Sequence, residues 1–421
     1  MVDAWLPYGR VEVCARVPTE NLEAILSLGA KAGTKDFEGE IRRSLEAPLG
    51  AKRLSEIAGP EDNIVLALNA LDALIAKPVI SSILGEISLA GLKGENLKVI
   101  FMQPIFHSKI TLSMGRLKDE LSSLGVSVLF HDALSENVYV GDTESGVKVY
   151  IDKVFAQSKV KIIASLIEPN PYTLYRGGGC DLILGLSSIE TLRQIFMPAL
   201  NTENPSDQIF RETHKASLML GDVFSINIVG NTKGEIIKAF AGDLERSFQE
   251  GIRVANEVYR VSVDRRTDII IVSAGGSPFD SSLFDACGCL ENALKVVKRN
   301  GCIILVAECL QGYGDMEFQE AMLRFKGDLI SLGRSLQKKF TIGGFVAYRF
   351  LRALKRAHVS MVSALPDFYV SEIGDLRIFR TVNEALANAL SELGRKSKVL
   401  VIPNGSLVIP ELKAVGVTGA G

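Results

Sequence analysis

The fold of this chain is decided by one stretch, which reads Asp268-Ile269-Ile270-Ile271-Val272-Ser273-Ala274-Gly275-Gly276-Ser277-Pro278-Phe279-Asp280. Its first part is a short, almost entirely apolar run, as expected for a strand buried on both faces of a parallel sheet. A glycine-containing loop follows, then a helix expected at residues 281–299 and a second apolar run at residues 302–307. A strand, a helix and a second strand make a β-α-β unit, so this region predicts a parallel sheet with right-handed crossovers.

The same alternation of short apolar runs and helical stretches extends along the whole chain. Further strands are expected at residues 11–17, 63–68, 97–102, 126–130, 148–151, 161–167, 224–229, 359–363 and 398–402. The clearest helix is expected at residues 382–393, where Thr381 and Glu384 form a capping box and Gly394 stands at the C-terminal cap. The pattern predicts an α/β protein.

The length of 421 residues predicts two domains. A polar, charged segment at residues 262–266 precedes a new β-α-β unit, which places an N-terminal α/β domain at residues 1–264 and a C-terminal one at residues 265–421. Each domain is expected to hold a mainly parallel, Rossmann-like sheet flanked by helices, with a ligand cleft between the two domains. The strand at residues 398–402 fits either domain.

Composition and charge exclude several classes of function. The formal net charge of −2 gives no field that favours nucleic acid or an anionic membrane. No apolar run approaches the roughly 20 residues of a membrane span, and the first ten residues lack the pattern of a signal peptide. A cytoplasmic protein is therefore expected, with its six cysteines reduced. The cysteines form no C-x-x-C pair, so the strong zinc signature is absent.

Two glycine-containing loops are candidate ligand sites, because ligands of open α/β sheets gather at the carboxyl ends of strands. In the first, Gly275, Gly276, Ser277 and Asp280 follow a buried strand and precede a helix N-terminus, which favours an anion. The alternative is a tight strand-to-helix turn in which Asp280 caps the helix. A third stretch, residues 308–315, should converge on the same edge as this first loop.

The second glycine-containing loop runs from Glu168 to Cys180 and follows the strand at residues 161–167. Gly177, Gly178 and the next glycine stand between Arg176 and Cys180, so their amides could cradle an anion. Cys180 would be a reactive thiolate if Arg176 lowered its pKa. The alternative for Cys180 is a small buried apolar side chain, which is how free cysteines usually behave.

The order of short motifs along the chain resembles the nickel-dependent lactate racemase family. The matching blocks are Leu6-Pro7-Tyr8-Gly9, Asn21-Leu22, His131-Asp132-Ala133, residues 146–153, Ile167-Glu168-Pro169, Gly177-Gly178, Asn227-Ile228-Val229, Phe240-Ala241-Gly242-Asp243, residues 275–280 and residues 301–314. The resemblance spans nearly the whole chain. It implies the two-domain α/β fold of that family and an isomerase that racemises a 2-hydroxy acid.

The resemblance also implies a nickel-pincer nucleotide as cofactor. In the family, that cofactor accepts hydride from the substrate and returns it to the other face. Two histidines act as general acid and base, since their pKa suits reversible proton transfer near neutral pH. An arginine holds the substrate carboxylate, a lysine anchors the cofactor, and a further histidine ligates nickel.

Most positions that carry this chemistry differ in this chain. One acid/base histidine matches His107, but the other falls at Asn170, whose amide cannot exchange a proton near neutral pH. The cofactor lysine falls at Cys180, the nickel histidine near Phe196 and the substrate arginine near Ala73. The expected site therefore has a catalytic centre and a cofactor-binding part, with no residue assigned to a metal. It comprises His107 and Asn170 for catalysis, and Gly177, Gly178, Cys180, Gly275, Gly276, Ser277 and Asp280 for the cofactor.

Three functions follow from these residues. The first is a racemase-like isomerase with His107 as base, acting on an altered 2-hydroxy acid or a related small polar metabolite. The second is a catalytically silent homologue that binds a small anion, a nucleotide or a protein, in which His107 is an ordinary turn residue. The third is a cysteine-based metal or redox protein, with a cluster of Cys180, Cys287 and Cys309. The expected partner is a small anionic molecule, and the sequence is also compatible with a homo-oligomer.

Overall fold

The computed structural model of the chain describes residues 1–69, 73–102, 104–106, 114–134, 136–371, 373 and 376–413. The chain divides into two compact units, here named the split unit (Met1–Gly29 with Tyr259–Gly421) and the continuous unit (Ala30–Val258). This division differs from the expected boundary between residues 264 and 265. The change near Tyr259 lies close to it. The N-terminal segment, however, belongs with the C-terminal half, because Leu22–Ile25 forms an edge strand of that half's sheet and Ala4, Leu6, Ala15 and Val17 join its hydrophobic core.

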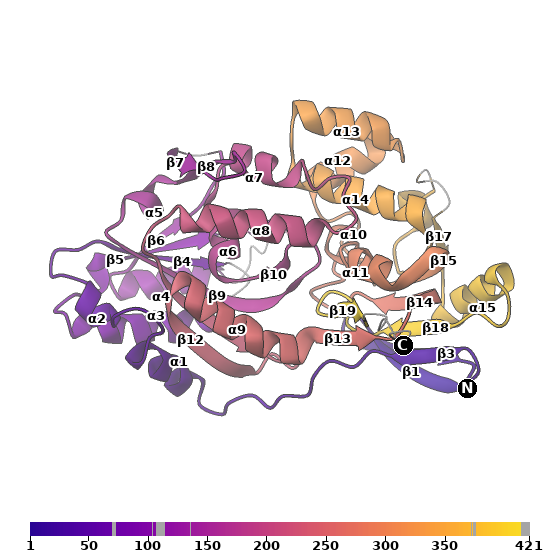
Figure 1. Cartoon of the computed structure of the whole chain (residues 1–421), viewed down its shortest axis with the longest axis horizontal. Coiled ribbons are helices and arrows are strands. Elements are labelled where there is room, and N and C mark those ends of the chain that lie inside the picture. Colours follow the sequence, from indigo (N-terminus) through magenta and orange to yellow (C-terminus); the bar gives the residue numbers. More distant parts are fainter. Residues whose placement is uncertain are drawn as a thin grey trace, which may run out of the picture. The chain divides into compact units, whose positions relative to one another are not determined.

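Among the described residues, the continuous unit is built on a seven-stranded sheet of order β12-β11-β9-β4-β5-β6, with β10 paired to β9 (Figure 1). Neighbours from β11 to β6 are parallel, whereas β12 and β10 are antiparallel to their partners. A separate hairpin joins β7 and β8. The strands are β4 (Ile64–Asn69), β5 (Leu97–Met102), β6 (Ser127–Phe130), β7 (Asn137–Asp142), β8 (Lys148–Asp152), β9 (Val160–Asn170), β10 (Leu174–Arg176), β11 (Phe224–Gly230) and β12 (Ile236–Asp243).

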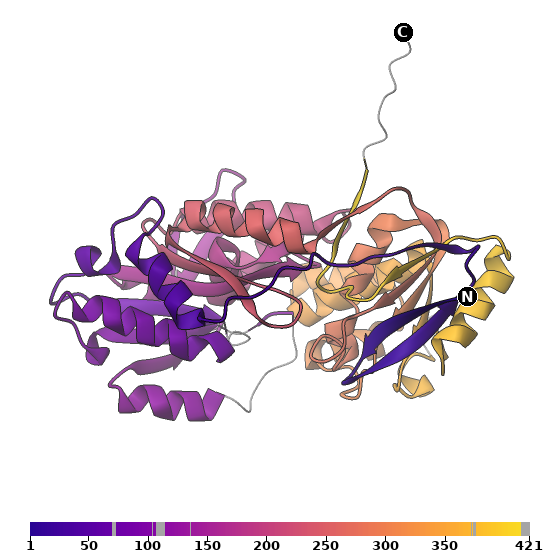
Figure 2. The ribbon, with the colours of Figure 1, turned by 90° about the horizontal axis from the view of Figure 1, so that it is seen from below.

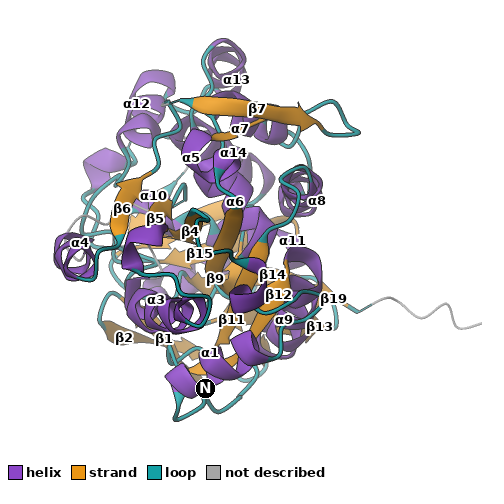
Figure 3. Cartoon of the chain, turned by 90° about the vertical axis from the view of Figure 1, so that its left-hand side faces the viewer, coloured by secondary structure: helices purple, strands orange, loops and turns teal. Residues whose placement is uncertain are grey.

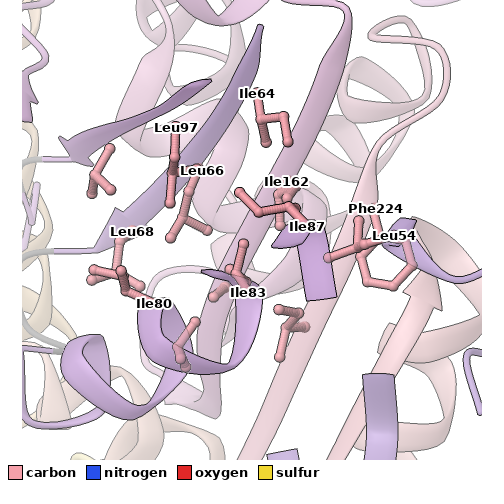
Figure 4. Packing of buried hydrophobic residues seen from close by; sticks show 14 of the residues in the cluster. Leu54, Ile64, Leu66, Leu68, Ile80, Ile83, Ile87, Leu97, Ile162 and Phe224 are labelled. Atoms are coloured by element: carbon pink, nitrogen blue, oxygen red, sulfur yellow. The ribbon is translucent and has the colours of Figure 1, made fainter. Parts of the chain in front are cut away.

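Helices cover both faces of this sheet (Figure 3). On one face, Ile80 and Ile83 of α3 pack with Leu66 and Leu68 of β4, as Figure 4 shows. On the other face, α6 packs on β4, β9 and β11, and Gly251 of α9 lies close to Ile167 of β9. Every residue of β4 is therefore buried, and the strand is apolar throughout until its last residue. The helices are α1 (Phe37–Glu46), α2 (Leu54–Ile57), α3 (Ala73–Ser88), α4 (Met114–Ser123), α5 (Lys153–Gln157), α6 (Gly178–Leu186), α7 (Ile189–Phe196), α8 (Pro205–Leu218) and α9 (Leu244–Tyr259), with a 3-10 turn η2 (Gly94–Asn96).

In the described part of the split unit, a six-stranded sheet has the order β17-β16-β15-β14-β18-β3, and all its pairings are parallel. The strand expected at residues 398–402 is β18, which lies between β14 and β3 and so belongs to this unit. Two further strands, β13 and β19, pair in parallel with each other. The strands are β3 (Leu22–Ile25), β13 (Arg260–Val263), β14 (Thr267–Ser273), β15 (Val297–Val306), β16 (His358–Val362), β17 (Arg377–Phe379), β18 (Val399–Ile402) and β19 (Ile409–Leu412).

A hairpin of β1 (Val2–Tyr8) and β2 (Val11–Val17) covers one face of this sheet together with α15 (Val382–Leu393) (Figure 2). The helix matches its predicted bounds, with the Thr381 hydroxyl accepting the N–H of Glu384 and Gly394 at φ +104° at its end. Helices α11 and α14 pack on the strands as well. The other helices are α10 (Leu283–Ala286), α11 (Cys289–Val296), α12 (Met316–Phe325), α13 (Leu329–Lys338) and α14 (Ile342–Arg356), with a 3-10 turn η3 (Asp367–Tyr369).

The prediction of one continuous helix at residues 281–299 is wrong in detail. The chain there forms α10 and α11, with Gly288 between them, and β15 already begins at Val297. Glycine disfavours a continuous helix by about 1 kcal/mol relative to alanine, which suits a break at this point. Ser282, and not Asp280, caps α10, since its hydroxyl accepts the N–H of Asp285 at 3.2 Å. Among the described residues, every helix is too short or too polar to cross a bilayer.

Candidate functional site

The carboxyl end of β9 forms a tight hairpin with β10. The Asn170 side-chain oxygen accepts the N–H groups of Tyr172 at 2.9 Å and Thr173 at 3.2 Å. This Asx-type geometry turns the chain so that Arg176 comes to lie opposite Glu168 on the neighbouring strand. Asn170, expected at a catalytic position, therefore shapes the turn through its oxygen.

A buried ionic cluster, the β9-end cluster, lies behind this turn and consists of Glu168, Arg176, Asp181 and Asn69. The Arg176 Nε lies 3.1 Å from Glu168 Oε2, and its Nη1 lies 3.6 Å from Asp181 Oδ2. At the end of β4, the Asn69 amide donates to Asp181 Oδ2 at 3.5 Å. The Arg176 and Asp181 side chains are only 9% and 4% exposed.

Burial raises the pKa of the Asp181 carboxyl, and the Arg176 guanidinium opposes that rise only in part. Asp181 thus keeps its proton to a higher pH than an ordinary aspartate. Sequence reasoning missed this residue. Its signal was an acidic side chain in the first turn of an otherwise apolar helix, directly after a glycine run.

The glycine run before α6 allows close packing. Gly177 and Gly178 have φ of +109° and +50°, and the Gly178 N–H donates to the Ser165 hydroxyl at 2.8 Å. A Cβ on Gly178 would lie 2.7 Å from the Phe248 ring, so a larger residue would push α6 away from α9. These contacts account for the glycines by packing, and their cofactor-binding role stays a prediction.

The Cys180 thiol is buried in the same helix. Its sulfur accepts a hydrogen bond from the Thr213 hydroxyl at 3.5 Å, and burial raises the pKa of the thiol to about 12. The expectation that Arg176 lowers this pKa is wrong, because the guanidinium instead pairs with Glu168 and Asp181. A protonated, buried thiol is a poor nucleophile and a poor metal ligand.

In the split unit, the loop after β14 is built around the tip of the β1–β2 hairpin. Gly276 has φ of +72°, and a Cβ there would lie 2.9 Å from the Gly9 carbonyl oxygen. The Ser277 N–H donates to that oxygen at 2.8 Å. The fully buried Asp280 Oδ2 accepts the N–H of Gly9 at 2.6 Å and that of Glu308 at 3.2 Å. Asp280 thereby connects its own loop to the hairpin tip at Gly9 and to the segment that begins at Glu308. Its Oδ1 has no hydrogen-bond partner among the described residues.

The stretch at residues 308–315 converges on this loop, which confirms that expectation. The Cys309 N–H donates to the Asp280 carbonyl at 2.8 Å. Nearby, burial raises the pKa of Tyr8 to about 12, with Glu308, Cys309 and Asp280 adding to the rise. The carboxylates of Asp280 and Glu308 make this edge acidic, which weighs against an anion as the ligand of this particular loop.

The remaining expected site residues are placed as follows. His107 lies outside the described residues. His131, which stands in one of the blocks that match the family, is buried between Asp152, 3.1 Å from its Nδ1, and the Ser187 carbonyl, 3.4 Å from its Nε2. Phe196 is buried against the ring of Phe106, with centroids 5.7 Å apart. Within the described ranges, no group of three or more His, Cys, Asp or Glu side chains is arranged to hold a metal ion.

Comparisons with known proteins cover both units. Residues 8–206 match the family described as the lactate racemase N-terminal domain, and residues 262–410 match the lactate racemase C-terminal domain. The chain is 26% identical to the lactate racemase of Thermoanaerobacterium thermosaccharolyticum, over 97% of this chain and 99% of that protein. It is 27% identical to the lactate racemase of Lactiplantibacillus plantarum, over 97% and 100%.

Solved structures show the same fold. The lactate racemase apoprotein from Thermoanaerobacterium thermosaccharolyticum superposes with a TM-score of 0.82 at 23% identity, covering 97% of this chain and 100% of that one. A Thermotoga maritima protein from a structural genomics project superposes with a TM-score of 0.60 at 14% identity, covering 89% and 98%. The similarity therefore extends over nearly the full length of this chain.

Proposed function

Because this chain belongs to the lactate racemase family, we propose that it is a racemase-like isomerase that acts on a 2-hydroxy acid or related small polar metabolite other than lactate. The observation that carries this proposal is the β9-end cluster. Its arginine and two carboxyl groups lie at the carboxyl end of a parallel sheet, where open α/β folds bind their ligands. Buried ionic groups with a shifted pKa are typical of functional sites.

Each residue of the cluster has a chemistry that suits this role. A guanidinium binds carboxylates with two parallel hydrogen bonds, so Arg176 is the proposed contact for the acid group of the substrate. Asp181, whose pKa is raised by burial, can hold and release a proton. His107, which follows β5 in the sequence, is proposed as the second proton-transferring group.

The nickel-pincer nucleotide of the family does not fit the described residues. The position of its anchoring lysine is Cys180, whose thiol is buried and protonated. The position of the nickel-ligating histidine is near Phe196, which lies in an aromatic contact. The proposed reaction therefore contains no step on that cofactor. An anionic ligand, a cytoplasmic location and a homo-oligomer stay predictions.

Chiral chromatography tests the proposal. Protein purified without oxygen is incubated with single enantiomers of a panel of 2-hydroxy acids, and native mass spectrometry with elemental analysis records any bound group. We expect conversion of at least one acid other than lactate. Replacing His107 by Gln, or Asp181 by Asn, should lower kcat/KM by about 100-fold or more. Asp142→Asn, at an exposed aspartate of the same unit, should leave it unchanged.

A catalytically silent homologue is the second candidate, favoured by the use of Asn170 in the turn and by the buried Cys180 thiol. It predicts that the acids bind without conversion and that Asp181→Asn changes affinity alone. The cysteine-based alternative predicts loss of activity or metal in Cys180→Ser. A mass increase of nucleotide size together with nickel would instead show that the family cofactor is retained, against the misfit above.

A further inference from the structure

We infer that the split unit binds the ammonium group of a small primary amine at Asp280, Glu308 and Tyr8, a set of residues named here the acidic edge. The two carboxylates follow the parallel strands β14 and β15, at the carboxyl end of the sheet, where open α/β folds bind their ligands. The inference is independent of the proposed isomerase activity, because the acidic edge belongs to the split unit and the β9-end cluster to the continuous unit.

Both carboxylates contact the same residue, Gly9 at the tip of the β1–β2 hairpin. The Asp280 Oδ2 atom accepts the Gly9 N–H at 2.6 Å and the Glu308 N–H at 3.2 Å. The Glu308 side chain lies against the Cα of Gly9, since a Cβ there would lie 2.9 Å from Glu308 Oε1 and closer still to Oε2. Two negative charges are therefore held around one backbone residue.

In the part of the chain that the structure describes, no cation pairs with either carboxylate. Asp280 is fully buried, and its Oδ1 has no hydrogen-bond partner there. The half-buried Glu308 side chain makes no ion pair or hydrogen bond with the described residues, and the neighbouring Arg10 is exposed. A buried carboxylate without a cation or a full set of donors costs free energy. An occupant that supplies both positive charge and N–H donors would remove that cost.

The oxygen atoms of the acidic edge suit an ammonium group. An ammonium has three N–H donors and no acceptor, and the edge offers it Asp280 Oδ1, the Glu308 carboxylate and the Tyr8 hydroxyl. Burial raises the pKa of Tyr8 to about 12, and the nearby charges of Glu308 and Asp280 add to the rise, so the hydroxyl stays neutral. The described residues form no group of three or more side chains suited to a metal ion, which favours an organic cation.

Exposed apolar side chains beside the acidic edge suit an amine with an apolar body. Leu310, two residues after Glu308, is 73% exposed. Gly312 of the same segment lies against Tyr369, whose ring packs on the 69% exposed Phe368 with centroids 4.3 Å apart. Exposed large apolar side chains rimmed by polar residues often mark ligand sites. An amine with an aromatic body would contact both the carboxylates and these side chains.

Isothermal titration calorimetry on the full chain tests the site at low salt. The probes are phenethylamine, phenethyltrimethylammonium, phenethyl alcohol and MgCl₂. We expect phenethylamine to bind. The trimethylammonium ion has no N–H donor and the alcohol has no charge, so each should bind at least about tenfold more weakly. Added NaCl should weaken the binding of phenethylamine, since charge attraction is screened.

Single variants localise the binding. Glu308→Gln should weaken binding of phenethylamine about tenfold or more, the usual effect of losing a hydrogen bond to a charged group. Tyr8→Phe keeps the ring and removes the hydroxyl, and it should weaken binding by a smaller factor. Glu320→Gln, at a 72% exposed glutamate of α12, is the matched control and should leave binding unchanged. Equal urea midpoints would show that each variant is folded.

Four results would overturn the inference. The first two are the absence of phenethylamine binding and equal binding by Glu308→Gln and the wild type. The third is equal affinity for phenethyl alcohol, which would show an apolar site that does not recognise the ammonium group. The fourth is displacement of phenethylamine by MgCl₂ at a concentration at which NaCl of equal ionic strength has no effect, which would assign the carboxylates to a metal ion.

Discussion

Burial determines the chemistry of the cysteine side chains. All six cysteines lie in the described part of the chain, and all except the partly exposed Cys14 are buried. Burial raises the pKa of Cys180, Cys302 and Cys309 to about 12. We therefore expect a thiol-reactive disulfide reagent at pH 8 to modify at most one thiol per native chain and six after unfolding. Rapid modification of two or more thiols in the native protein would contradict this burial.

A second effect of burial concerns the ion pair between Arg349 of α14 and Glu291 of α11, joined by two hydrogen bonds of 2.7 Å. Replacing Arg349 by Met leaves a buried carboxylate without its cation and should lower the free energy of unfolding by about 3–5 kcal/mol. Urea unfolding of the full chain measures this. Arg324→Met, which breaks an exposed pair with Glu320, should cost less than about 1 kcal/mol. Adding Glu291→Met to Arg349→Met should recover most of the loss.

The pair of Asp152 and His131 gives the free energy of unfolding a testable dependence on pH. Burial alone would raise the pKa of Asp152, but hydrogen bonds from His131 and the Phe155 N–H outweigh it and lower the pKa. Because the pKa of Asp152 is lower in the folded state, its ionised carboxylate stabilises the protein at pH values above its ordinary pKa of 3.8. This contribution is lost as the pH falls through the folded-state pKa.

Asp152→Asn keeps the helix cap and removes the charge, so it isolates this contribution. It should cost roughly 1–3 kcal/mol at neutral pH and progressively less in acid, as measured by urea unfolding at several pH values. The exposed Asp142→Asn serves as the control. A difference from the wild type that does not change with pH would show that the charge of Asp152 contributes nothing.

At the scale of elements, long apolar runs predicted most of the two sheets. Strands β4, β5, β9, β11, β14 and β18 were all expected within a few residues of their observed bounds, because burial on both faces requires continuous apolar sequence. The missed strands include β10 and β17, which have three residues each, and β13 and β19, which have four. So short a strand has too few residues to show a period, and pairing with a neighbour decides its conformation.

The hydrogen bond between Asp280 and the tip of the β1–β2 hairpin can be tested by substitution. Asp280→Ala removes the acceptor for the Gly9 and Glu308 N–H groups. Losing a charge-assisted hydrogen bond of about 1.5–3 kcal/mol should speed hydrogen exchange at the Gly9 amide by about 10- to 100-fold. Asp280→Asn, which keeps an acceptor oxygen, should retain much of the protection. Hydrogen exchange at the β18 amides is the internal control. An unchanged exchange rate at the Gly9 amide in Asp280→Ala would contradict the proposed protection by Asp280.

At the scale of the whole molecule, the N-terminal segment is part of the split unit. Strand β3 pairs with β18, and Ala4, Leu6, Ala15 and Val17 cover the apolar face of the sheet. We expect a fragment of residues 30–258 to fold alone. A fragment of residues 259–413 should unfold at lower urea than the whole chain unless residues 1–29 are added. Circular dichroism during urea unfolding measures both, and full stability of the second fragment without residues 1–29 would contradict the division.

The candidate site could be predicted in part. Loops at the carboxyl ends of strands were identified because buried apolar runs mark the strands that precede them. Their glycines were interpreted as an anion cradle, which stays a prediction, and the structure adds a packing role, because Phe248 lies close to Gly178 and Gly9 lies close to Gly276. Those neighbours are far away in sequence, so residue type alone could not distinguish a packing role from a binding role.

By itself, the sequence determined the α/β class, the β-α-β order and the family, since these rest on local apolar periodicity and on short motifs in a given order. The tertiary structure alone decided which charges meet. It paired Arg176 with Glu168 and Asp181, and joined Asp280 to Gly9, 271 residues away. Such contacts depend on the packing of strands and helices in three dimensions. The pKa of a side chain depends on its burial and its neighbours, so the thiol of Cys180 and the carboxyl of Asp181 acquire their chemistry only in the folded chain.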